Sequence, residues 1–251
     1  MKKNYLFAVA ILISTLCSTS VRGQGSLTPP GGPAPTMKTL SQIEPRTPIS
    51  ALPYSITTPG SYYFTTNLSG SNGITIVTNN VTLDLSGFTL QGVSSTVSGI
   101  NISGAYNHIT VRNGCISGWS LRGIDGFYNG GTRNTLYENL IVSSNGYGGI
   151  VSDKNSIIRN CCAYGNGFGN TFVGLSTESG QIVDCVARGN ASAGIFGYNT
   201  TIRNCVSESN VGPGFECNAG SVWDCGSYNN SSYGIELEGG PKHDVVTCKG
   251  M

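Results

Sequence analysis

Apolar residues recur along this chain at one fixed place, directly after a glycine. From residue 175 onward the recurrence has a period of twenty residues, and the blocks 181–200, 201–220 and 221–240 align without gaps. Earlier copies lie 24–26 residues apart, because insertions fall in one loop of the unit. The column consists of Ile74, Ile100, Ile124, Ile150, Leu175, Ile195, Phe215 and Ile235. The chain therefore contains about eight copies of one short unit.

Each unit has the composition of β-structure. Its segments of three to five residues are rich in Ile, Val, Thr and aromatic residues, they are separated by Gly and Asn, and they show no helical period. A unit this short cannot bury its apolar side alone, so neighbouring units must stack. The leucine pattern of a leucine-rich repeat and the roughly 40-residue blades of a propeller are both missing. The sequence predicts an all-β parallel β-helix, a solenoid of about eight rungs.

Two columns of polar residues keep the same register as the apolar column. Asparagine tolerates the left-handed backbone of a sharp corner, and stacked copies can hydrogen-bond from rung to rung. One column predicts such corners and consists of Asn113, Asn139, Asn160, Asp184, Asn204 and Asp224. The other follows six residues later and consists of Asn145, Asn166, Asn190, Asn210 and Asn230.

A column of cysteines lies directly after the corner positions, at Cys161, Cys185, Cys205 and Cys225. Metal binding would require histidine or paired C-x-x-C spacing, and the column has neither. The column predicts a buried ladder of small thiols. One or more disulfides remain an alternative, although in-register strands point neighbouring Cβ atoms in parallel, which suits the bond poorly.

The N-terminal sixty residues differ from the repeats. Lys2 and Lys3 precede an apolar stretch at 5–13 that is too short to span a membrane, so residues 1–23 are expected to be a secretory signal peptide. Eight of the ten prolines fall between Pro29 and Pro59. We expect a Pro/Gly linker at 24–36, an N-terminal cap at 37–60 and the β-helix at 61–251. The mature chain would then be secreted or at the cell surface, without a membrane span.

Charge narrows the possible partners. The chain has 14 basic and 13 acidic residues, and removal of 1–23 takes away three basic ones, which leaves 11 against 13, a formal charge of −2. Lys and Arg form no cluster. Nucleic acid is therefore excluded as a partner, whereas a polysaccharide is compatible. The oligomeric state stays open.

The run NNVTLDLSGFTLQG (79–92) and the blocks I-R-N-C-x-x-x-x-N-x-x-x-G-I resemble the right-handed parallel β-helix repeat proteins of the pectate-lyase-like superfamily. Residues 27–50, followed by ITTPGSYYFTTNLSG (56–70), are similar to the start of secreted bacterial members of unassigned function. This resemblance covers nearly the whole mature chain. It implies the fold and leaves the activity open, because the superfamily contains lyases, hydrolases, epimerases and adhesins.

The catalytic patterns that the resemblance offers are missing. The chain has no adjacent Asp pair, no Gly-His-Gly and no Arg-x-Lys element, and His108 and His243 fall at opposite ends of the repeats. The His, Tyr, Asp and Lys/Arg grouping of alginate-acting enzymes is not visible on one face. The sequence favours a non-catalytic protein. We expect no cofactor, and Ca²⁺ is the one alternative that stays open.

Glu216 and Glu236 occupy equivalent outward positions, with Phe196 one rung before them. Stacked carboxylates repel each other unless a cation or a shared proton relieves them. One interpretation of the group is a Ca²⁺ or sugar site, in which a Glu acts as acid or base and a sugar stacks on Phe196 or Tyr198. The other interpretation is a solvated acidic face. The next outward column is expected to be Asp153, Glu178, Tyr198, Asn218 and Glu238, which adds Glu238 to the candidate metal ligands.

A further outward column, Arg112, Glu138, Arg159, Val183, Arg203 and Trp223, could bind an acidic sugar through Arg203 and Trp223 or could simply pair opposite charges between rungs. Three functions remain. The first is an exported, non-catalytic β-helix that binds or displays carbohydrate at the cell surface. The second is a lyase, hydrolase or epimerase acting on an acidic glycan at Glu216 and Glu236. The third is a structural fragment of a longer passenger.

Overall fold

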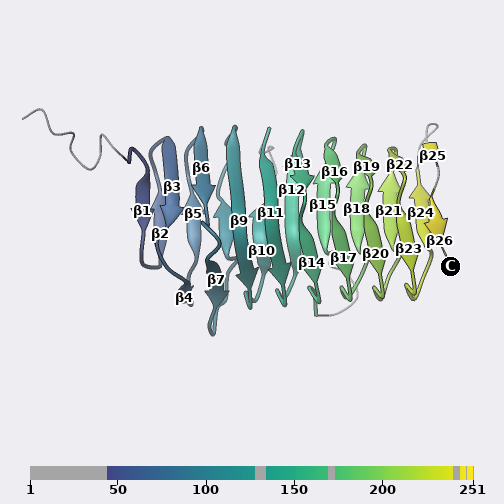
Figure 1. The fold of residues 1–251 in the computed structure, drawn as a ribbon, viewed down its shortest axis with the longest axis horizontal. Helices are drawn as coiled ribbons and strands as arrows, with labels where there is room; N and C mark the ends of the chain where they lie inside the picture. The colour runs from purple at the N-terminus through teal and green to yellow at the C-terminus, as the bar shows by residue number, and fades with distance from the viewer. Residues whose placement is uncertain (1–43, 128–133, 169–172, 240–243, 247, 251) are drawn as a thin grey trace, which may run out of the picture. The chain divides into compact units, whose positions relative to one another are not determined.

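Each turn of the chain contributes short strands to a stack of parallel turns (Figure 1). The computed structural model describes residues 44–127, 134–168, 173–239, 244–246 and 248–250. The predicted signal peptide, the predicted linker and residues 37–43 of the predicted cap lie outside these ranges. Among the described residues no helix is long and apolar enough to cross a membrane.

Three parallel ladders of strands make up the coil, and each full turn visits them in the same order. Ladder 1 contains β1 (Thr47–Ile49), β3 (Gly60–Phe64), β6 (Val81–Asp84), β9 (Ile109–Ser117), β11 (Leu136–Ser143), β13 (Ile157–Arg159), β16 (Gln181–Val183), β19 (Thr201–Arg203), β22 (Ser221–Trp223) and β25 (Asp244–Val246). Ladder 2 contains β4 (Leu68–Gly70), β7 (Thr89–Gly92), the second halves of β9 and β11, β14 (Cys162–Tyr164), β17 (Val186–Arg188), β20 (Val206–Glu208), β23 (Gly226–Tyr228) and β26 (Lys249–Gly250).

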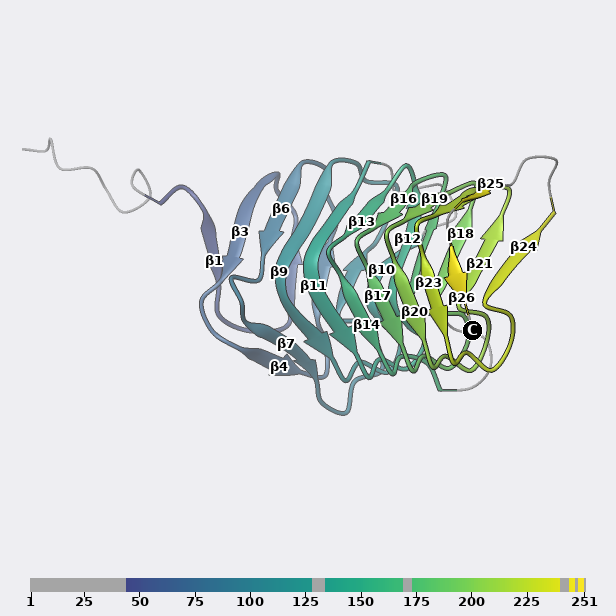
Figure 2. The same cartoon turned by 45° about the vertical axis from the view of Figure 1, so that its right-hand side comes forward.

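The third ladder is a separate sheet of nine strands. It contains β2 (Tyr54–Ile56), β5 (Ile74–Ile76), β8 (Ile100–Ile102), β10 (Arg122–Gly126), β12 (Gly148–Lys154), β15 (Leu175–Glu178), β18 (Ile195–Tyr198), β21 (Phe215–Asn218) and β24 (Ile235–Glu238). Figure 2 shows the turns obliquely, with the ladder 1 strands β13, β16 and β19 above the ladder 2 strands β14, β17 and β20.

The corner between ladders 1 and 2 falls on the predicted Asn/Asp column. All six residues have a left-handed backbone, with φ between 50° at Asp224 and 60° at Asn113. Side chains in this column also bond between rungs, since Asn139 Nδ2 donates to Asn113 Oδ1 at 3.2 Å and Asn204 Nδ2 donates to Asp184 Oδ1 at 2.5 Å. The left-handed corner is therefore confirmed at all six positions, and the bonding between rungs is confirmed for these two pairs.

The coil begins earlier than the sequence suggested. Strand β1 pairs with β3, and β2 pairs with β5, in the same parallel registers as the later turns. The boundary at residue 60 is therefore wrong, because residues 47–56 of the expected cap contribute strands to the coil. The nine-stranded sheet accordingly has one strand more than the eight expected rungs.

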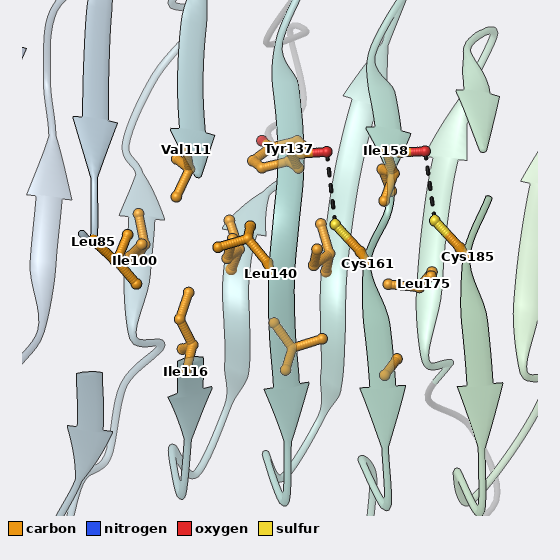
Figure 3. Close-up of a cluster of buried hydrophobic side chains, with 14 of the residues drawn as sticks. Leu85, Ile100, Val111, Ile116, Tyr137, Leu140, Ile158, Cys161, Leu175 and Cys185 are labelled. Atoms are coloured by element: carbon orange, nitrogen blue, oxygen red, sulfur yellow. Dashed lines mark hydrogen bonds between the residues drawn. The ribbon is translucent and has the colours of Figure 1, made fainter. Parts of the chain in front are cut away.

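The predicted apolar column lines the inside of the nine-stranded sheet. Its members pair in register from Ile74 to Ile235, and all but Ile235 are fully buried. Opposite this column, ladder 1 buries Val111, Tyr137 and Ile158 (Figure 3). Burial of these ladders supplies the main stabilising free energy of the fold, roughly 1.5–3 kcal/mol for each large side chain.

The cysteine column forms the predicted buried ladder of thiols. The Cys161 Sγ donates to the Tyr137 carbonyl at 3.7 Å, and the Cys185 Sγ donates to the Ile158 carbonyl at 3.6 Å (Figure 3). Cys205 and Cys225 continue the same pattern. All eight cysteines among the described residues are free thiols, so the disulfide alternative is not realised there.

The second asparagine column is an interior stack. Asn145, Asn166, Asn190 and Asn210 are fully buried, and each Nδ2 donates to the Oδ1 of the next rung at 2.9–3.0 Å. Each Nδ2 also donates to a main-chain carbonyl of a preceding turn. The stack therefore satisfies buried amides that would otherwise oppose folding.

Candidate functional site

The outer surface of the nine-stranded sheet carries a continuous column of side chains in register. Strand pairing aligns Phe196 with Glu216 and Glu216 with Glu236, so this part of the predicted arrangement is confirmed. The whole column consists of Ser55, Thr75, Asn101, Asp125, Val151, Ser176, Phe196, Glu216 and Glu236. Aromatic and carboxylate groups therefore lie one strand apart on a single surface.

The neighbouring outward column differs from the prediction at one position. A register shift between β12 and β15 places Lys154, not Asp153, opposite Glu178. Asp153 is 2% exposed, and its Oδ1 accepts a hydrogen bond from the Lys154 amide at 2.8 Å. The prediction that Asp153 faces outward is wrong, because the bulge turns its side chain inward. Lys154 Nζ instead lies 3.7 Å from Glu178 Oε1.

Three hollows lie on this surface. The first encloses about 430 Å³ and is lined by residues of β2, β5, β8 and β10, including Asn101 and Asp125. The second, the central hollow, encloses about 320 Å³ and is lined by Arg122, Tyr147, Val151, Val173, Ser192, Phe196 and Glu216. The third, the aromatic hollow, encloses about 320 Å³ and is lined by Phe127, Ser152, Thr177, Glu178, Phe196 and Tyr198.

Arg122 connects the first and central hollows. Its Nη1 donates to Asp125 Oδ1 at 2.7 Å, so the guanidinium in the central hollow is held by a carboxylate of the first hollow. Among the described residues, the buried Arg122 Nε has no hydrogen-bond partner. The side chain is thus fixed in position while one N–H donor is unused, and unused donors of this kind are rare in proteins.

Glu216 and Arg122 both line the central hollow, from β21 and β10, which are four strand spacings apart in the sheet. Burial raises the pKa of the Glu216 carboxyl, and the charges of Glu236 and Glu238 raise it further. A carboxyl of this kind takes up a proton more readily than an ordinary surface glutamate. The central hollow therefore combines a cation, a carboxyl of raised pKa and the side chain of Tyr147 in one lining.

The three glutamates at the C-terminal end do not form a metal centre. Glu216 and Glu236 are neighbours on β21 and β24, and Glu238 lies two residues further along β24. Among the described residues, no group of three or more His, Cys, Asp or Glu side chains has an arrangement that could hold a metal ion. The geometry thus gives no specific support to the Ca²⁺ hypothesis.

Trp223 and Arg203 lie on a different surface from Phe196 and Tyr198. They are adjacent in register on β19 and β22 of ladder 1, so the four candidate ligand-binding residues do not form one site. Their column shows pairing of opposite charges between rungs, since Arg112 Nε bonds Asp84 Oδ2 at 3.1 Å and Arg159 Nη2 bonds Glu138 Oε2 at 2.5 Å. The simpler interpretation of that column is confirmed for these pairs.

Sequence reasoning missed Arg122, Phe127 and Tyr147. Arg122 begins β10, Phe127 follows it and Tyr147 precedes β12. In this region the repeats are 24–26 residues apart, so the columns do not align by counting. A search around each Gly-apolar pair would have found Arg122, which directly precedes Gly123. The structure therefore places Arg122, Asp125 and Tyr147 on one surface of the sheet, in two neighbouring hollows whose linings include no histidine.

Comparisons with known proteins show the fold. The chain is similar in structure to the A-module of the Azotobacter vinelandii mannuronan C-5 epimerase AlgE6, with a TM-score of 0.59, 17% identity, and coverage of 76% of this chain and 67% of that one. The A-module of AlgE4 from the same organism gives a TM-score of 0.58 and 14% identity over 76% of this chain and 68% of that one. No family model and no curated protein matches the sequence. The chain has the right-handed parallel β-helix fold.

Proposed function

We propose that this chain is an exported protein that binds a polysaccharide along the outer surface of its nine-stranded sheet, without cleaving it. The observation that carries the proposal is the position of Phe196, which borders both the central and the aromatic hollow. Sugar sites combine aromatic faces with a few fixed polar groups. The polar groups Arg122 and Glu216 line the central hollow, and further aromatic rings line the aromatic hollow.

The surroundings of Phe196 support a chain-like ligand. The first and central hollows follow one another along the stack of turns, and the bond between Arg122 and Asp125 connects them. The aromatic hollow lies beside the central hollow over the same turns, and Phe196 borders both. Strands in a sheet are about 4.8 Å apart, close to the length of one sugar unit in an extended glycan, so successive units would meet successive strands. The two structural neighbours are named as enzymes of mannuronan, which is compatible with a glycan partner.

The test is a glycan array followed by calorimetric titration of the best oligosaccharide. Phe196→Ala is expected to weaken binding at least tenfold, because it removes the ring shared by two hollows. Trp223→Ala, on ladder 1, is the matched control and should bind as the unaltered protein does. An array without signal, or equal losses in the two variants, would refute a site at Phe196.

A second function has one specific observation in its favour. The central hollow places Glu216, whose pKa is raised by burial and by Glu236 and Glu238, on the same surface as Arg122 and Tyr147. These groups could act as acid, base and charge stabiliser in a lyase or epimerase reaction on an acidic glycan. Incubation with mannuronan and pectate, with detection of unsaturated products and of altered sugar configuration, tests this function. Any activity should disappear in Glu216→Gln.

A further inference from the structure

The aromatic hollow differs in chemistry from the central hollow beside it. Its walls are the rings of Phe127, Phe196 and Tyr198, and two of these side chains, Phe127 and Tyr198, are 47% and 49% exposed. Phe127 follows β10 and Tyr198 ends β18, three strand spacings apart, which is about 14 Å along the sheet. The hollow is thus an apolar cup bounded by aromatic side chains from separate turns.

The floor of this cup offers little hydrogen bonding. Ser152 and Thr177 are both buried. The Thr177 hydroxyl donates to the Asp153 carbonyl at 3.0 Å, and the Ser152 hydroxyl lies 3.3 Å from the Thr135 hydroxyl. Because both hydroxyls are engaged below the surface, the floor presents mainly carbon atoms. A ligand group with polar atoms of its own would lose water there without gaining partners.

The rim of the cup is electrically balanced. Glu178 is the charged residue of the lining, and its carboxylate lies 3.7 Å from the Lys154 ammonium. An acidic sugar therefore meets a cation that is already paired, and a cationic sugar meets a carboxylate that is already paired. Charge complementarity favours an uncharged unit at this position.

The group that occupies the aromatic hollow belongs to a larger ligand that also contacts the polar central hollow. Phe196 borders the cup on one side and the central hollow, with Arg122 and Glu216, on the other. A lipid chain would have to place methylene groups against these charged residues, whereas a glycan would place hydroxyl groups there. A volume of about 320 Å³ is at the lower end of the range of roughly 300–1,000 Å³ for small-molecule sites, which suits a single sugar unit.

We infer that the aromatic hollow recognises a methyl group on an uncharged sugar unit of the bound glycan, supplied by an acetamido substituent or by a 6-deoxy sugar. Both sources present the same chemistry, a methyl group beside a ring that stacks on an aromatic face. The inference rests on the proposed glycan-binding function and specifies which glycan is bound.

Two pairs of neutral oligosaccharides test it by calorimetric titration of the full chain. N-acetylglucosamine hexamers are compared with glucose hexamers of the same linkage, and 6-deoxymannose oligomers with mannose oligomers of the same linkage. In at least one pair, the methyl-bearing member should bind roughly four- to fifteenfold more tightly, the effect expected of one or two buried methyl-sized groups. The pair that shows the preference identifies the source of the methyl group.

Variants assign the preference to the hollow. Phe127→Ser and Tyr198→Ser should each abolish the preference, while Tyr198→Phe and the ladder 1 control Trp223→Ser should retain it. Thermal unfolding confirms that each variant is folded, and the exposure of both substituted rings makes folding defects small. If glycans bind without any preference, or if the preference survives both serine variants, the inference is overturned and the proposed function stands. If no glycan binds at all, both fail.

Discussion

Asn145 donates two hydrogen bonds to one oxygen of Asn166, from its main-chain N at 3.2 Å and from its Nδ2 at 3.0 Å. Asn166 repeats this pattern toward Asn190, and Asn190 toward Asn210, always with both donors on one Oδ1. Each amide therefore completes the hydrogen bonding of the rung before it. Loss of one member leaves buried donors without an acceptor on the preceding rung.

Asn190→Ala is expected to lower the free energy of unfolding by about 2–4 kcal/mol, because the Asn166 main-chain N and Nδ2 lose their acceptor in a buried environment. Urea unfolding followed by circular dichroism measures the change. Asn101→Ala is the control, since Asn101 is an outward residue of β8 and its loss should cost no more than about 0.5 kcal/mol. Equal effects of the two substitutions would contradict the role of the stack.

Glu216→Gln is expected to raise the melting temperature at pH 7.5. Burial, followed by the charges of Glu236 and Glu238, raises the pKa of this carboxyl in the folded state above its unfolded value. The folded protein therefore binds the proton more tightly, so the group favours folding more as the pH falls, and its ionised form opposes folding at neutral pH.

The difference between the two proteins should shrink as the pH falls through the raised folded-state pKa of Glu216, and it should vanish below about 4.3, where an unfolded glutamate is protonated too. Melting curves from pH 3.5 to 8 measure this trend. The control is Glu138→Gln, which removes a carboxylate paired with Arg159 and should not stabilise the protein. A lower melting temperature of Glu216→Gln at pH 7.5 would show that the carboxylate has a stabilising partner.

The thiols should react in two classes. Burial raises the pKa of Cys217 to about 11, and hydrogen bonding between neighbouring thiols raises those of Cys185 and Cys205. Only thiolates alkylate readily, so these buried residues should stay unmodified during a short iodoacetamide pulse at pH 8. Cys115 and Cys162 are partly exposed and should be labelled first. Peptide mass mapping distinguishes the classes, and early labelling of Cys205 would contradict the buried ladder.

Arg122→Gln is expected to weaken glycan binding by about 10- to 100-fold, the usual effect of losing a hydrogen bond to a charged group. Arg203→Gln removes the same charge from ladder 1 and should leave the affinity unchanged. Calorimetric titration compares the two, and melting curves account for the loss of the bond to Asp125. A matching loss of affinity in Arg203→Gln would place the ligand elsewhere.

The sequence alone predicted which residues align in columns, but it did not predict which side chains share a surface. Gly-apolar spacing correctly aligned Ile195, Phe215 and Ile235, and it thereby placed Glu216 next to Glu236, because a constant period fixes strand register. Asp153 was misplaced, because a bulge changes which side chain faces outward without changing the period.

Which columns share a surface depends on where the chain bends. Phe196 and Trp223 both occupy outward positions, yet they belong to different ladders, and the repeat pattern does not state the angle between them. The central hollow also depends on turn residues such as Tyr147 and Ser192, whose placement follows from loops of unequal length. The fold could therefore be predicted from the repeat pattern, whereas the composition of the site depends on how the turns place their residues in space.

The blocks 181–200, 201–220 and 221–240 align without gaps, and each supplies one strand to every ladder, as β16 to β18 and β19 to β21 show. Duplication of one block would therefore add a whole rung, about 4.8 Å of new surface, and would leave the corner asparagines and the interior amides in register. The length of this protein can change in such increments through unequal recombination. The length of the proposed glycan-binding surface could thus evolve separately from the side chains that would determine which glycan is bound.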